Sequence, residues 1–517
     1  MQIIDNKALL LRVKNPERVT ECIPKAKILP DGGLLVKWGL EEAQVLVNLG
    51  IKNVPSPITA HYEWCGMYEP FNHQRATAGF LTLHRRAFCL NEAGTGKTNA
   101  VIWAADYLMS LGLIKRVLVL CPMSIMNAAW ASDLFRTAMH RTVAVAHHTN
   151  SSKRRVAVSG GAEFVICNFD GLEIVQKEVM QGGFDLVVVD ECNYYKNTNT
   201  NRYKVFKRVI TPKTWIWMLT GTPASQSPMD AYGLAKIINP TRIPPTMSAF
   251  RDSVMYKATQ FRWIPKPTAE KTVYEALQPA IRYTKDECLD LPEMLYTKRD
   301  TPLSKQQFKY YEELRKQMVT IAAGEEISAA NAAAAINKLL QISLGCVYVN
   351  DAEFIKFDIS HRFNELLDII AESSHKVLVF VPFRHVISVL EMELIASKVS
   401  CAVIHGGVNL NKRSDIFDRF QTEAEPKVLV IQPQAASHGL TLHAANTVVW
   451  WGPITSVETY IQANARVHRA GQKNACTVVH LQGSSIEKRI YKMLDEKIGQ
   501  HEMLVDLYRK ELGGRYE

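Results

Sequence analysis

The feature that most constrains the fold is a rhythm in which short, wholly apolar runs alternate with amphipathic segments. Between residues 85 and 245 these runs are RAFCL, RVLVLCP, TVAVAH, EFVICNF, FDLVVVDE and WIWMLTGT. Runs this short and this uniformly apolar are typical of strands buried on both faces, and strands that alternate with helices form parallel sheets. The pattern therefore predicts a doubly wound α/β lobe.

The same rhythm returns later, in KVLVFVP, CAVIHGG, KVLVIQ, NTVVWWG and ACTVVHLQ, after a mostly helical stretch with an alanine-rich segment. A chain of 517 residues is too long for a single core. We therefore expect two α/β lobes with doubly wound parallel sheets and an insert between them. The predicted parts are an N-terminal accessory module (1–60), a first lobe (61–245), a helical insert and linker (246–355), a second lobe (356–483) and a C-terminal helical segment (484–517).

The first sixty residues have their own pattern. AKILPDGGLLVKW alternates around a turn at Asp31-Gly32-Gly33, which predicts a hairpin. LEEAQVLVNLG then predicts a helix that ends at Gly50. We expect a small α+β module, and its nearly balanced charges exclude a basic nucleic-acid tail.

Composition narrows the class of protein. The net charge of +10 fits a polyanionic partner and is equally compatible with many soluble enzymes. Ten cysteines are scattered singly, with no CxxC pair and no Cys/His cluster at zinc-ligand spacing, which favours a reducing compartment. The chain begins without the apolar core of a signal peptide and contains no apolar run long enough for a membrane span. We expect neither secretion nor membrane insertion.

A phosphate-binding loop is indicated by CLNEAGTGKTNA, which follows an apolar run and opens a helix. Gly94 and Gly96 let backbone N–H groups close around phosphates at a helix N-terminus. Lys97 would reach the β- and γ-phosphates, and Thr98 would bind Mg²⁺. Asn91 stands where the usual pattern has its first glycine. The alternative is a glycine-rich turn without a ligand.

A pair of carboxylates, Asp190 and Glu191, ends the apolar run FDLVVVDE. Such a pair suits a role in which Asp190 holds Mg²⁺ through water while Glu191 orients or deprotonates the attacking water. Strands often end in acidic residues without any such role. The pair follows Lys97 by roughly ninety residues, and this spacing favours the functional interpretation.

Two arginines, Arg466 and Arg469, lie three residues apart in QANARVHRAGQ. On a helix this spacing places both side chains on one face. The γ-phosphoryl group needs additional positive charge in the transition state, and guanidinium groups supply it. We expect these residues to act as arginine fingers. The alternative is a surface pair that bonds to acidic neighbours.

Taken in order, these motifs resemble those of helicase superfamily 2, with LTGTP at residues 219–223 as a further match. QANARVHRAGQ is similar to the QxxxRxxRxGQ box of the Swi/Snf-type DNA translocases within that superfamily. The resemblance extends over about residues 68–495. Within the family, VVWWGPITSVETYIQANARVHRAGQ and the compact insert look most like small phage, bacterial and HepA-related annealing-type members.

The resemblance implies two RecA-like lobes, ATP and Mg²⁺ as cofactors, and a set of site residues. Catalysis would rest on Lys97, Asp190, Glu191, Arg466 and Arg469, and the metal on Thr98 and Asp190. The nucleotide would be held by Gln74, which reads adenine, and by Glu92, Ala93, Gly94, Thr95, Gly96, Lys97, Thr98 and Gly439. Nucleic acid would contact Pro122, Ser124, Asn168, Thr220, Thr222, His405, Gly406 and Thr441.

Several positions depart from the family pattern. Asn193 stands where the family usually has histidine, and its amide can bridge to the TGTP segment but cannot titrate. Thr441 replaces an asparagine, and Asn168-Phe169 replace a Thr-Tyr pair, which leaves the nucleic-acid contacts there open. His405 and His438 are expected to contact backbone or phosphate rather than to act as acid–base catalysts.

Two further features have a structural and a functional interpretation. Trp450 and Trp451 end an apolar run, and we expect at least one of them in the core. The basic run NRYKVFKRVITPK (201–213) either tracks a DNA backbone or forms the solvated face of a helix.

The resemblance predicts a monomeric, ATP-dependent translocase on double-stranded or branched DNA, which remodels or reanneals DNA structures. One alternative is a strand-separating DNA or RNA helicase, and a second is a nucleic-acid-binding scaffold with an inactive ATPase. No membrane partner is expected. The expected location is the cytoplasm of a bacterial or phage-infected cell, with the nucleus as the alternative.

Overall fold

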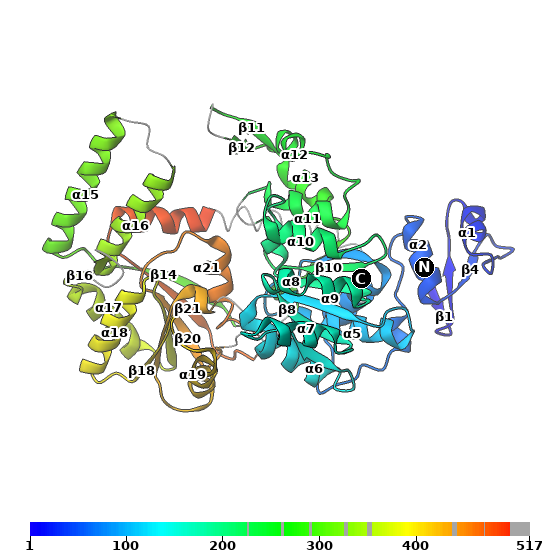
Figure 1. Ribbon diagram of the computed structural model, residues 1–517, viewed down its shortest axis with the longest axis horizontal. Coiled ribbons are helices and arrows are strands. Elements are labelled where there is room, and N and C mark those ends of the chain that lie inside the picture. Colours follow the sequence, from blue (N-terminus) through cyan, green and yellow to red (C-terminus); the bar gives the residue numbers. More distant parts are fainter. Residues whose placement is uncertain are drawn as a thin grey trace. The chain divides into compact units, whose positions relative to one another are not determined.

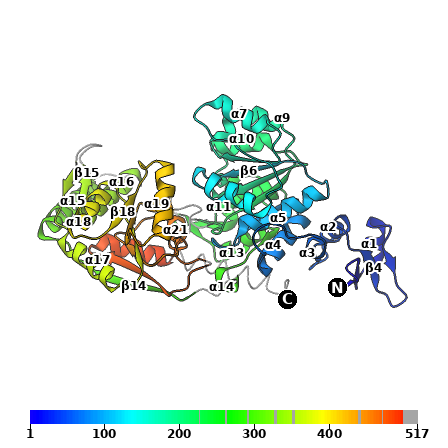
Figure 2. The ribbon, with the colours of Figure 1, turned by 90° about the horizontal axis from the view of Figure 1, so that it is seen from below.

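A computed structural model describes residues 1–224, 227–259, 263–288, 292–324, 329–348, 354–436, 442–469 and 471–496. One compact unit extends from Met1 to Leu289 and a second from Asp290 to Gln500. The first unit is coloured blue to green in Figures 1 and 2, and the second green to red. Each unit is built around a parallel sheet, so the predicted fold class is confirmed.

The N-terminal module is a four-stranded antiparallel sheet with two helices. Its strands β1 (Gln2–Ile4), β2 (Ala8–Leu11), β3 (Lys27–Ile28) and β4 (Leu34–Lys37) lie in the order β1-β2-β4-β3, with α1 (Pro16–Cys22) and α2 (Leu40–Asn48). The predicted hairpin is present as β3 and β4, with Gly32 at a φ of 78° in its turn. The predicted helix is α2, and Gly50 follows it at a φ of 83°. Apolar side chains of this module belong to the same buried cluster as those of the lobe that follows.

The first lobe contains a seven-stranded parallel sheet. Its strands are β5 (Arg86–Cys89), β6 (Val117–Cys121), β7 (Val143–Val145), β8 (Phe164–Asn168), β9 (Leu186–Asp190), β10 (Trp215–Leu219) and β13 (Ala280–Ile281), in the order β13-β5-β10-β9-β6-β8-β7. Alternate residues of β6 enter different cores, because Val117 and Val119 belong to one buried cluster while Leu118 and Leu120 belong to another. The sheet is therefore covered on both faces, as the wholly apolar runs predict.

Helices of the first unit cover these faces (Figures 1 and 2). They are α3 (Ile58–His61), α4 (Asn72–Leu83), α5 (Lys97–Ser110), α6 (Ser132–Thr137), α7 (Ser151–Ser159), α8 (Gly171–Ile174), α9 (Gln176–Gln181), α10 (Asn201–Val209), α11 (Asp230–Ile238), α12 (Met247–Val254), α13 (Ala269–Ala276) and α14 (Lys285–Cys288). In the basic run 201–213, α10 buries Tyr203, Val205, Phe206 and Val209, and its lysines and Arg208 face solvent.

The second lobe contains a six-stranded parallel sheet. Its strands are β14 (Met294–Asp300), β17 (Lys376–Phe380), β18 (Cys401–Ile404), β19 (Val428–Ile431), β20 (Ala445–Trp450) and β21 (Cys476–Gln482), in the order β14-β21-β20-β17-β19-β18. Its helices include α17 (Ser360–Glu372), α18 (Arg384–Ala396), α19 (Leu410–Thr422), α20 (Pro433–Ala436) and α21 (Val457–Asn464). Trp450 and Trp451 are both fully buried, in clusters on opposite faces, so both belong to the core.

The stretch 246–355 is divided between the two units. It contains α12, α13, α15 (Lys305–Gly324) and α16 (Ala329–Leu344), and the small hairpins β11 (Met255–Lys257) with β12 (Trp263–Pro265) and β15 (Cys346–Tyr348) with β16 (Phe354–Lys356). Two of its strands complete the large sheets, because β13 pairs with β5 and β14 pairs with β21. The C-terminal segment is helical over residues 485–496.

All ten cysteines are free thiols. Cys22 is exposed, and Cys65, Cys288 and Cys401 are half-buried, while Cys89, Cys121, Cys167, Cys192, Cys346 and Cys476 are buried. Among the residues that the structure describes, no helix is both long and apolar enough to cross a membrane.

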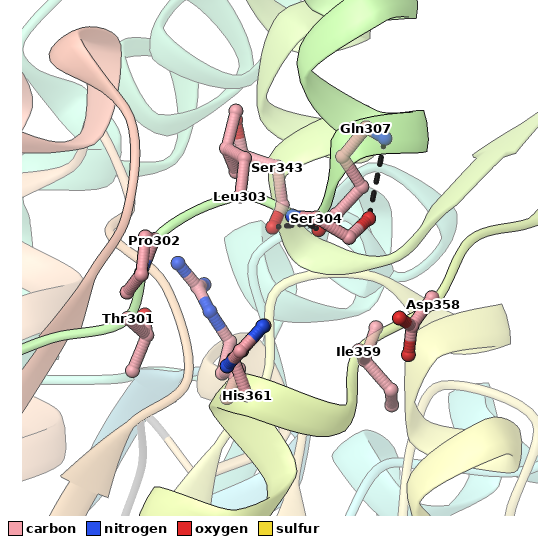
Figure 3. A pocket seen from close by; sticks show the side chains of 10 residues that line it. Thr301, Pro302, Leu303, Ser304, Gln307, Ser343, Asp358, Ile359 and His361 are labelled. Atoms are coloured by element: carbon pink, nitrogen blue, oxygen red, sulfur yellow. Dashed lines mark hydrogen bonds between the residues drawn. The ribbon is translucent and has the colours of Figure 1, made fainter.

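A buried ion pair stabilises the second lobe. Arg362 on α17 donates from Nη2 to Glu487 Oε1 at 2.6 Å and from Nη1 to the carbonyl of Trp451 at 2.6 Å. The other carboxylate oxygen of Glu487 accepts from Ser484 N at 2.8 Å. Beside Arg362 lies a cavity of about 10 Å³, close to the size of one water molecule, with Thr301, Ser304 and His361 among its walls (Figure 3).

Removing the carboxylate of this pair should destabilise the protein strongly. Glu487→Ala leaves the Arg362 charge buried without its anionic partner, so we expect the free energy of unfolding to fall by about 3–5 kcal/mol. Urea denaturation followed by tryptophan fluorescence measures this change. Glu393→Ala is the control, because it removes an exposed ion pair with Lys356 at 2.8 Å and should cost less than about 1 kcal/mol. Equal losses of unfolding free energy in the two variants would contradict the strong contribution of the Arg362–Glu487 pair.

Candidate functional site

Three neighbouring strands of the first lobe end at the same level. Leu219 at the end of β10 pairs with Cys89 of β5 on one side and with Asp190 of β9 on the other. The loops that follow β5, β10 and β9 therefore leave the sheet side by side at its carboxyl edge. Ligands of open parallel sheets bind at this edge.

The loop after β5 has the conformation that phosphate binding requires. Gly94 and Gly96 have φ angles of 94° and 73°, in the left-handed region that favours glycine. Helix α5 begins at Lys97, directly after Gly96. The Lys97 Nζ donates to the carbonyl of Glu92 at 3.0 Å, so the ammonium group folds back over the loop. The predicted strand, glycine loop and helix are all present.

Gln74 on α4 lies against this loop. Its Oε1 accepts from Phe71 N at 2.9 Å, and its Nε2 donates to the carbonyl of Gly96 at 3.2 Å. The neighbouring His73 Nε2 is 2.8 Å from the carbonyl of Thr95. Burial lowers the pKa of His73, which favours the neutral form of its ring. Helix α4 thus holds the loop at two successive residues.

Asp190 and Glu191 stand at the end of β9. The Asp190 Oδ2 accepts from the indole Nε1 of Trp130 at 2.9 Å, and its Oδ1 accepts from Glu191 N at 3.0 Å. Glu191 has a φ of 57°, an unusual conformation for a residue other than glycine that clusters at functional sites. The pKa of the Cys89 thiol is raised to about 11, mainly by burial. The Lys97 charge acts to lower this pKa and the Asp190 charge acts to raise it. Both charges therefore act on the end of the same strand.

The donor set fits a magnesium ion. Thr98 is half-buried in the first turn of α5, and Asp190 supplies carboxylate oxygens at the end of β9. Mg²⁺ takes oxygen ligands and is commonly held by one or two protein groups together with phosphate oxygens and water. A hydroxyl and a carboxylate beside a phosphate loop match that preference.

Asn193 makes the bridge that the sequence predicts. Its Nδ2 donates to Thr220 Oγ1 at 3.1 Å and to the carbonyl of Thr222 at 3.2 Å. Thr220 and Thr222 are 0% and 4% exposed. Both threonines are therefore buried beside Asn193, and their contact with nucleic acid stays a prediction.

Arg466 and Arg469 do not share a helix face, so that expectation is wrong. Helix α21 ends at Asn464, and both arginines lie in the turns that follow it. Beyond the helix, the Gln472 side chain holds these turns, because its Nε2 donates to the carbonyls of Val467, at 3.2 Å, and Ala445, at 2.9 Å. Arg466 is buried and Arg469 is half-buried.

The remaining predicted contacts lie at carboxyl ends of strands. Pro122 follows β6 and Asn168 ends β8, and these ends are adjacent because Cys121 pairs with Asn168. Ser124 is exposed in the same loop as Pro122. In the second lobe, His405 and Gly406 follow β18, and Arg413 Nη2 donates to both of their carbonyls at 3.0 Å. Gly439, Thr441 and His438 lie outside the described residues.

Sequence reasoning missed some polar partners of the site. Trp130, which bonds Asp190, lies sixty residues before it in the chain. Arg282, which bonds the phosphate loop, lies 192 residues from its partner Leu90. Neither residue follows a spacing rule, so a single sequence carries no signal for these contacts.

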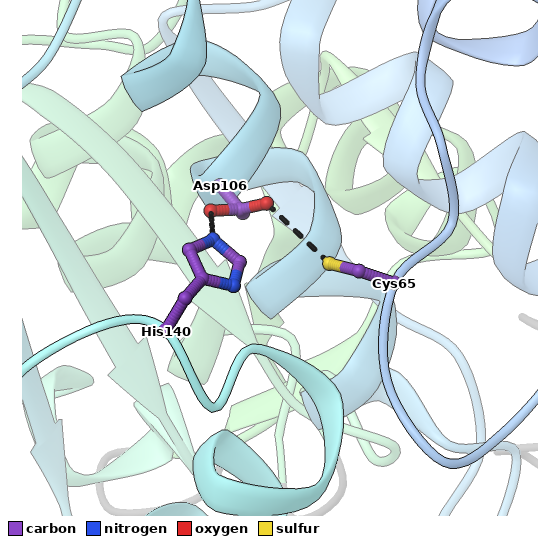
Figure 4. Close-up of side chains that lie close together, drawn as sticks. All are labelled: Cys65, Asp106 and His140. Carbon is purple, nitrogen blue, oxygen red and sulfur yellow. Dashed lines mark hydrogen bonds and ion pairs between the residues drawn. The ribbon is translucent and has the colours of Figure 1, made fainter.

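A second polar cluster contains Cys65, Asp106 and His140 (Figure 4), whose ligand-type atoms lie within 4.8 Å of one another. Asp106 Oδ1 accepts from Arg141 Nε at 2.6 Å and lies 2.9 Å from His140 Nε2. Its Oδ2 accepts from Tyr62 OH at 2.6 Å. Asp106 therefore already has a cationic partner and several hydrogen bonds, and the cluster fastens residues 62–65 to α5.

Comparisons with known proteins identify two family domains in this chain. Residues 73–346 match the SNF2-related domain, and residues 361–471 match the helicase conserved C-terminal domain. An uncharacterised ATP-dependent helicase of Mycoplasma genitalium is 26% identical over 418 residues, which are 79% of this chain and 39% of that protein. A SWI/SNF-related, matrix-associated, actin-dependent regulator of chromatin, subfamily A-like protein 1, from Xenopus laevis is 26% identical over 84% of this chain and 43% of its own length.

The corresponding protein from Drosophila melanogaster is 24% identical over 75% of this chain and 49% of its own length. The chain thus spans less than half the length of these relatives. Among solved structures, the SWI2/SNF2 ATPase core of Sulfolobus solfataricus in complex with double-stranded DNA is 19% identical, with a TM-score of 0.41, over 87% of this chain and 99% of that one.

The close contact of Gln74 with the phosphate loop leads to a matched pair of variants. A Cβ at Gly96 would lie 2.1 Å from Gln74 Nε2, whereas a Cβ at Gly112, at the other end of α5, would meet nothing within 4 Å. Both glycines have positive φ, so each alanine variant should lose about 1–2 kcal/mol of stability. We expect only Gly96→Ala to weaken binding of a fluorescent ATP analogue, measured by titration. Equal affinities in the two variants would contradict the contact's role.

Proposed function

We propose that this chain is a motor that moves along double-stranded DNA. It belongs to the SNF2-related family, since the family match covers more than half of its 517 residues, and it is an ATPase of helicase superfamily 2. The observation that carries the proposal is the alignment of the Lys97 loop with the Asp190-Glu191 pair at one sheet edge. ATP hydrolysis there would drive stepping on the phosphate backbone.

We propose the following roles in hydrolysis. The N–H groups at the start of α5 and the Lys97 ammonium bind the β- and γ-phosphates, and Gln74 reads adenine. Thr98 and Asp190 hold Mg²⁺, which neutralises phosphate charge when bound. Glu191 orients the attacking water and accepts its proton. Glu92, Ala93, Thr95 and, in the second lobe, Gly439 complete the nucleotide site.

Arg466 and Arg469 are proposed to stabilise the transition state. A guanidinium beside the γ-phosphoryl group is worth about 10³ to 10⁵ in rate. Both residues belong to the QxxxRxxRxGQ motif of the family. They lie in the turns after α21, so the role proposed for them does not require that they share a helix face. Their planar, permanently charged groups suit the equatorial oxygens of the transferring phosphoryl better than a lysine ammonium does.

Contacts to DNA are proposed at the loops that follow β6, β8 and β18, through Pro122, Ser124, Asn168, His405 and Gly406, with Thr441 as a further candidate. Backbone phosphate contacts of this kind carry no sequence information. The net charge of +10 supports a polyanionic partner. We propose that the chain acts as a monomer that remodels or reanneals double-stranded or branched DNA. The resemblance to HepA-related annealing-type members supports this activity over strand separation. The Mycoplasma relative supports a bacterial or phage setting.

The choice of nucleic acid can be tested with four substrates. We expect blunt duplex and forked DNA to stimulate ATP hydrolysis more than single strands or RNA, without release of a labelled strand from the duplex. Because phosphates are the main contacts, duplex affinity should fall steeply between about 50 and 200 mM salt. Strand release from the blunt duplex would favour the strand-separating helicase, and stimulation by RNA alone would contradict the proposal.

Two substitutions separate binding from hydrolysis. Lys97→Ala removes the charge beside the phosphates, so both ATP affinity and turnover should be lost. Glu191→Gln keeps shape and hydrogen bonding but cannot accept a proton, so ATP and DNA should bind while turnover falls about 10²-fold or more. Equilibrium titration with an ATP analogue and a phosphate-release assay measure both properties. Near-parental turnover in both variants would point to a different site.

A further inference from the structure

The segment 280–285 runs alongside the phosphate loop. Strand β13 pairs with β5, and the ladder continues beyond both strands, because Leu90 N donates to the carbonyl of Ile281 at 2.8 Å and Glu92 N to that of Tyr283 at 2.9 Å. Here the backbone of the loop is hydrogen-bonded as far as Glu92.

Asn91 strengthens this attachment on two sides. Its Nδ2 donates to Thr77 Oγ1 on α4 at 2.8 Å, and its Oδ1 accepts from Tyr283 N at 2.9 Å. The side chain is almost fully buried. The residue that replaces the usual glycine therefore connects α4, the loop and the segment 280–285.

Arg282 holds three parts of the site together. Its side chain is 2% exposed, and its Nη1 donates to the carbonyl of Leu90 at 2.6 Å and to that of Gly221 at 3.4 Å. Its Nη2 lies 3.4 Å from Glu92 Oε1, and Glu92 Oε2 accepts from Lys285 N at 3.1 Å. A buried guanidinium is stable only with such partners, and these bonds fix the orientation of the Arg282 side chain.

The positions of Glu92 and Ala93 decide the shape of the nucleotide site. Lys97 bonds the carbonyl of Glu92. A Cβ on Gly221 would lie 3.0 Å from Ala93 N, so the two loops are already in close contact. A shift of Glu92 would therefore move the Lys97 ammonium and the loop backbone together.

We propose that Arg282 is a positioning residue for ATP hydrolysis, which acts through Glu92 and Leu90 to hold the phosphate loop in its binding conformation. The proposal rests on the ATPase activity of the family and not on the DNA substrate. Arg282 does not itself contact the nucleotide in this role. Its effect on the reaction passes through the loop backbone that binds the phosphates.

The test compares Arg282→Gln and Arg282→Lys with the parent protein. Dissociation constants for a fluorescent ATP analogue are measured without DNA, and KM and kcat with saturating duplex. We expect Arg282→Gln to raise the dissociation constant and KM about ten-fold or more, with a smaller change in kcat, because two buried carbonyls and a carboxylate lose a charged donor. Arg282→Lys keeps the positive charge but lacks the planar guanidinium with its several N–H donors, so its dissociation constant and KM should be intermediate.

Arg86→Gln is the matched control. Arg86 lies at the opposite end of β5 and also donates to two carbonyls, those of Thr211 at 2.7 Å and Ile237 at 3.3 Å. We expect this variant to lower the midpoint of thermal unfolding and to leave the dissociation constant unchanged. An unchanged dissociation constant in folded Arg282→Gln, or an equal rise in Arg86→Gln, would overturn the proposal.

Glu92→Gln covers the case in which Arg282→Gln does not fold. It removes the anionic partner of Arg282 while leaving the bonds to Leu90 and Gly221 in place, so the dissociation constant should rise about three-fold. A parental dissociation constant in this variant would overturn the role assigned to Glu92. Loss of DNA stimulation with unchanged nucleotide binding in all variants would also count against the proposal.

Discussion

The register of three parallel strands is the constraint on which the candidate site depends. Because Leu219 pairs with both Cys89 and Asp190, the phosphate loop, the acidic pair and the TGTP loop all begin at the same level of the sheet. A slip of one residue in either ladder would turn the side chains of a strand to the opposite face. Burial on both faces of the sheet makes such a slip costly, so the core that stabilises the lobe also aligns its chemistry.

Much of the fold could be predicted from the sequence because strands buried on both faces leave an unmistakable apolar run. The phosphate loop could be located because Lys97 and Thr98 follow such a run directly. The turns that carry Arg466 and Arg469 could not, since Gln472 holds them through bonds to Val467 and to Ala445, a residue of another strand. The burial of Thr220 and Thr222 likewise depends on Asn193, a partner distant in sequence.

Two asparagines that depart from the family pattern have a common physical explanation. An amide offers a donor and an acceptor at one position. Asn91 uses both, toward Thr77 and Tyr283, and Asn193 donates to Thr220 and Thr222. Asn91 therefore adds a connection at a position where the usual glycine would offer no side chain, and Asn193 makes its bridge with an amide where the family usually has histidine. Neither amide adds charge to the surroundings of the nucleotide site.

The burial of the thiols makes the chain suited to selective labelling. Cys22, on the N-terminal module, is the exposed cysteine, while burial raises the pKa values of the half-buried Cys65, Cys288 and Cys401 and so reduces their thiolate fraction at neutral pH. A maleimide dye used briefly at neutral pH would therefore attach mainly to Cys22. Fluorescence from that dye would report the surroundings of the accessory module during turnover, with no cysteine removed from the core.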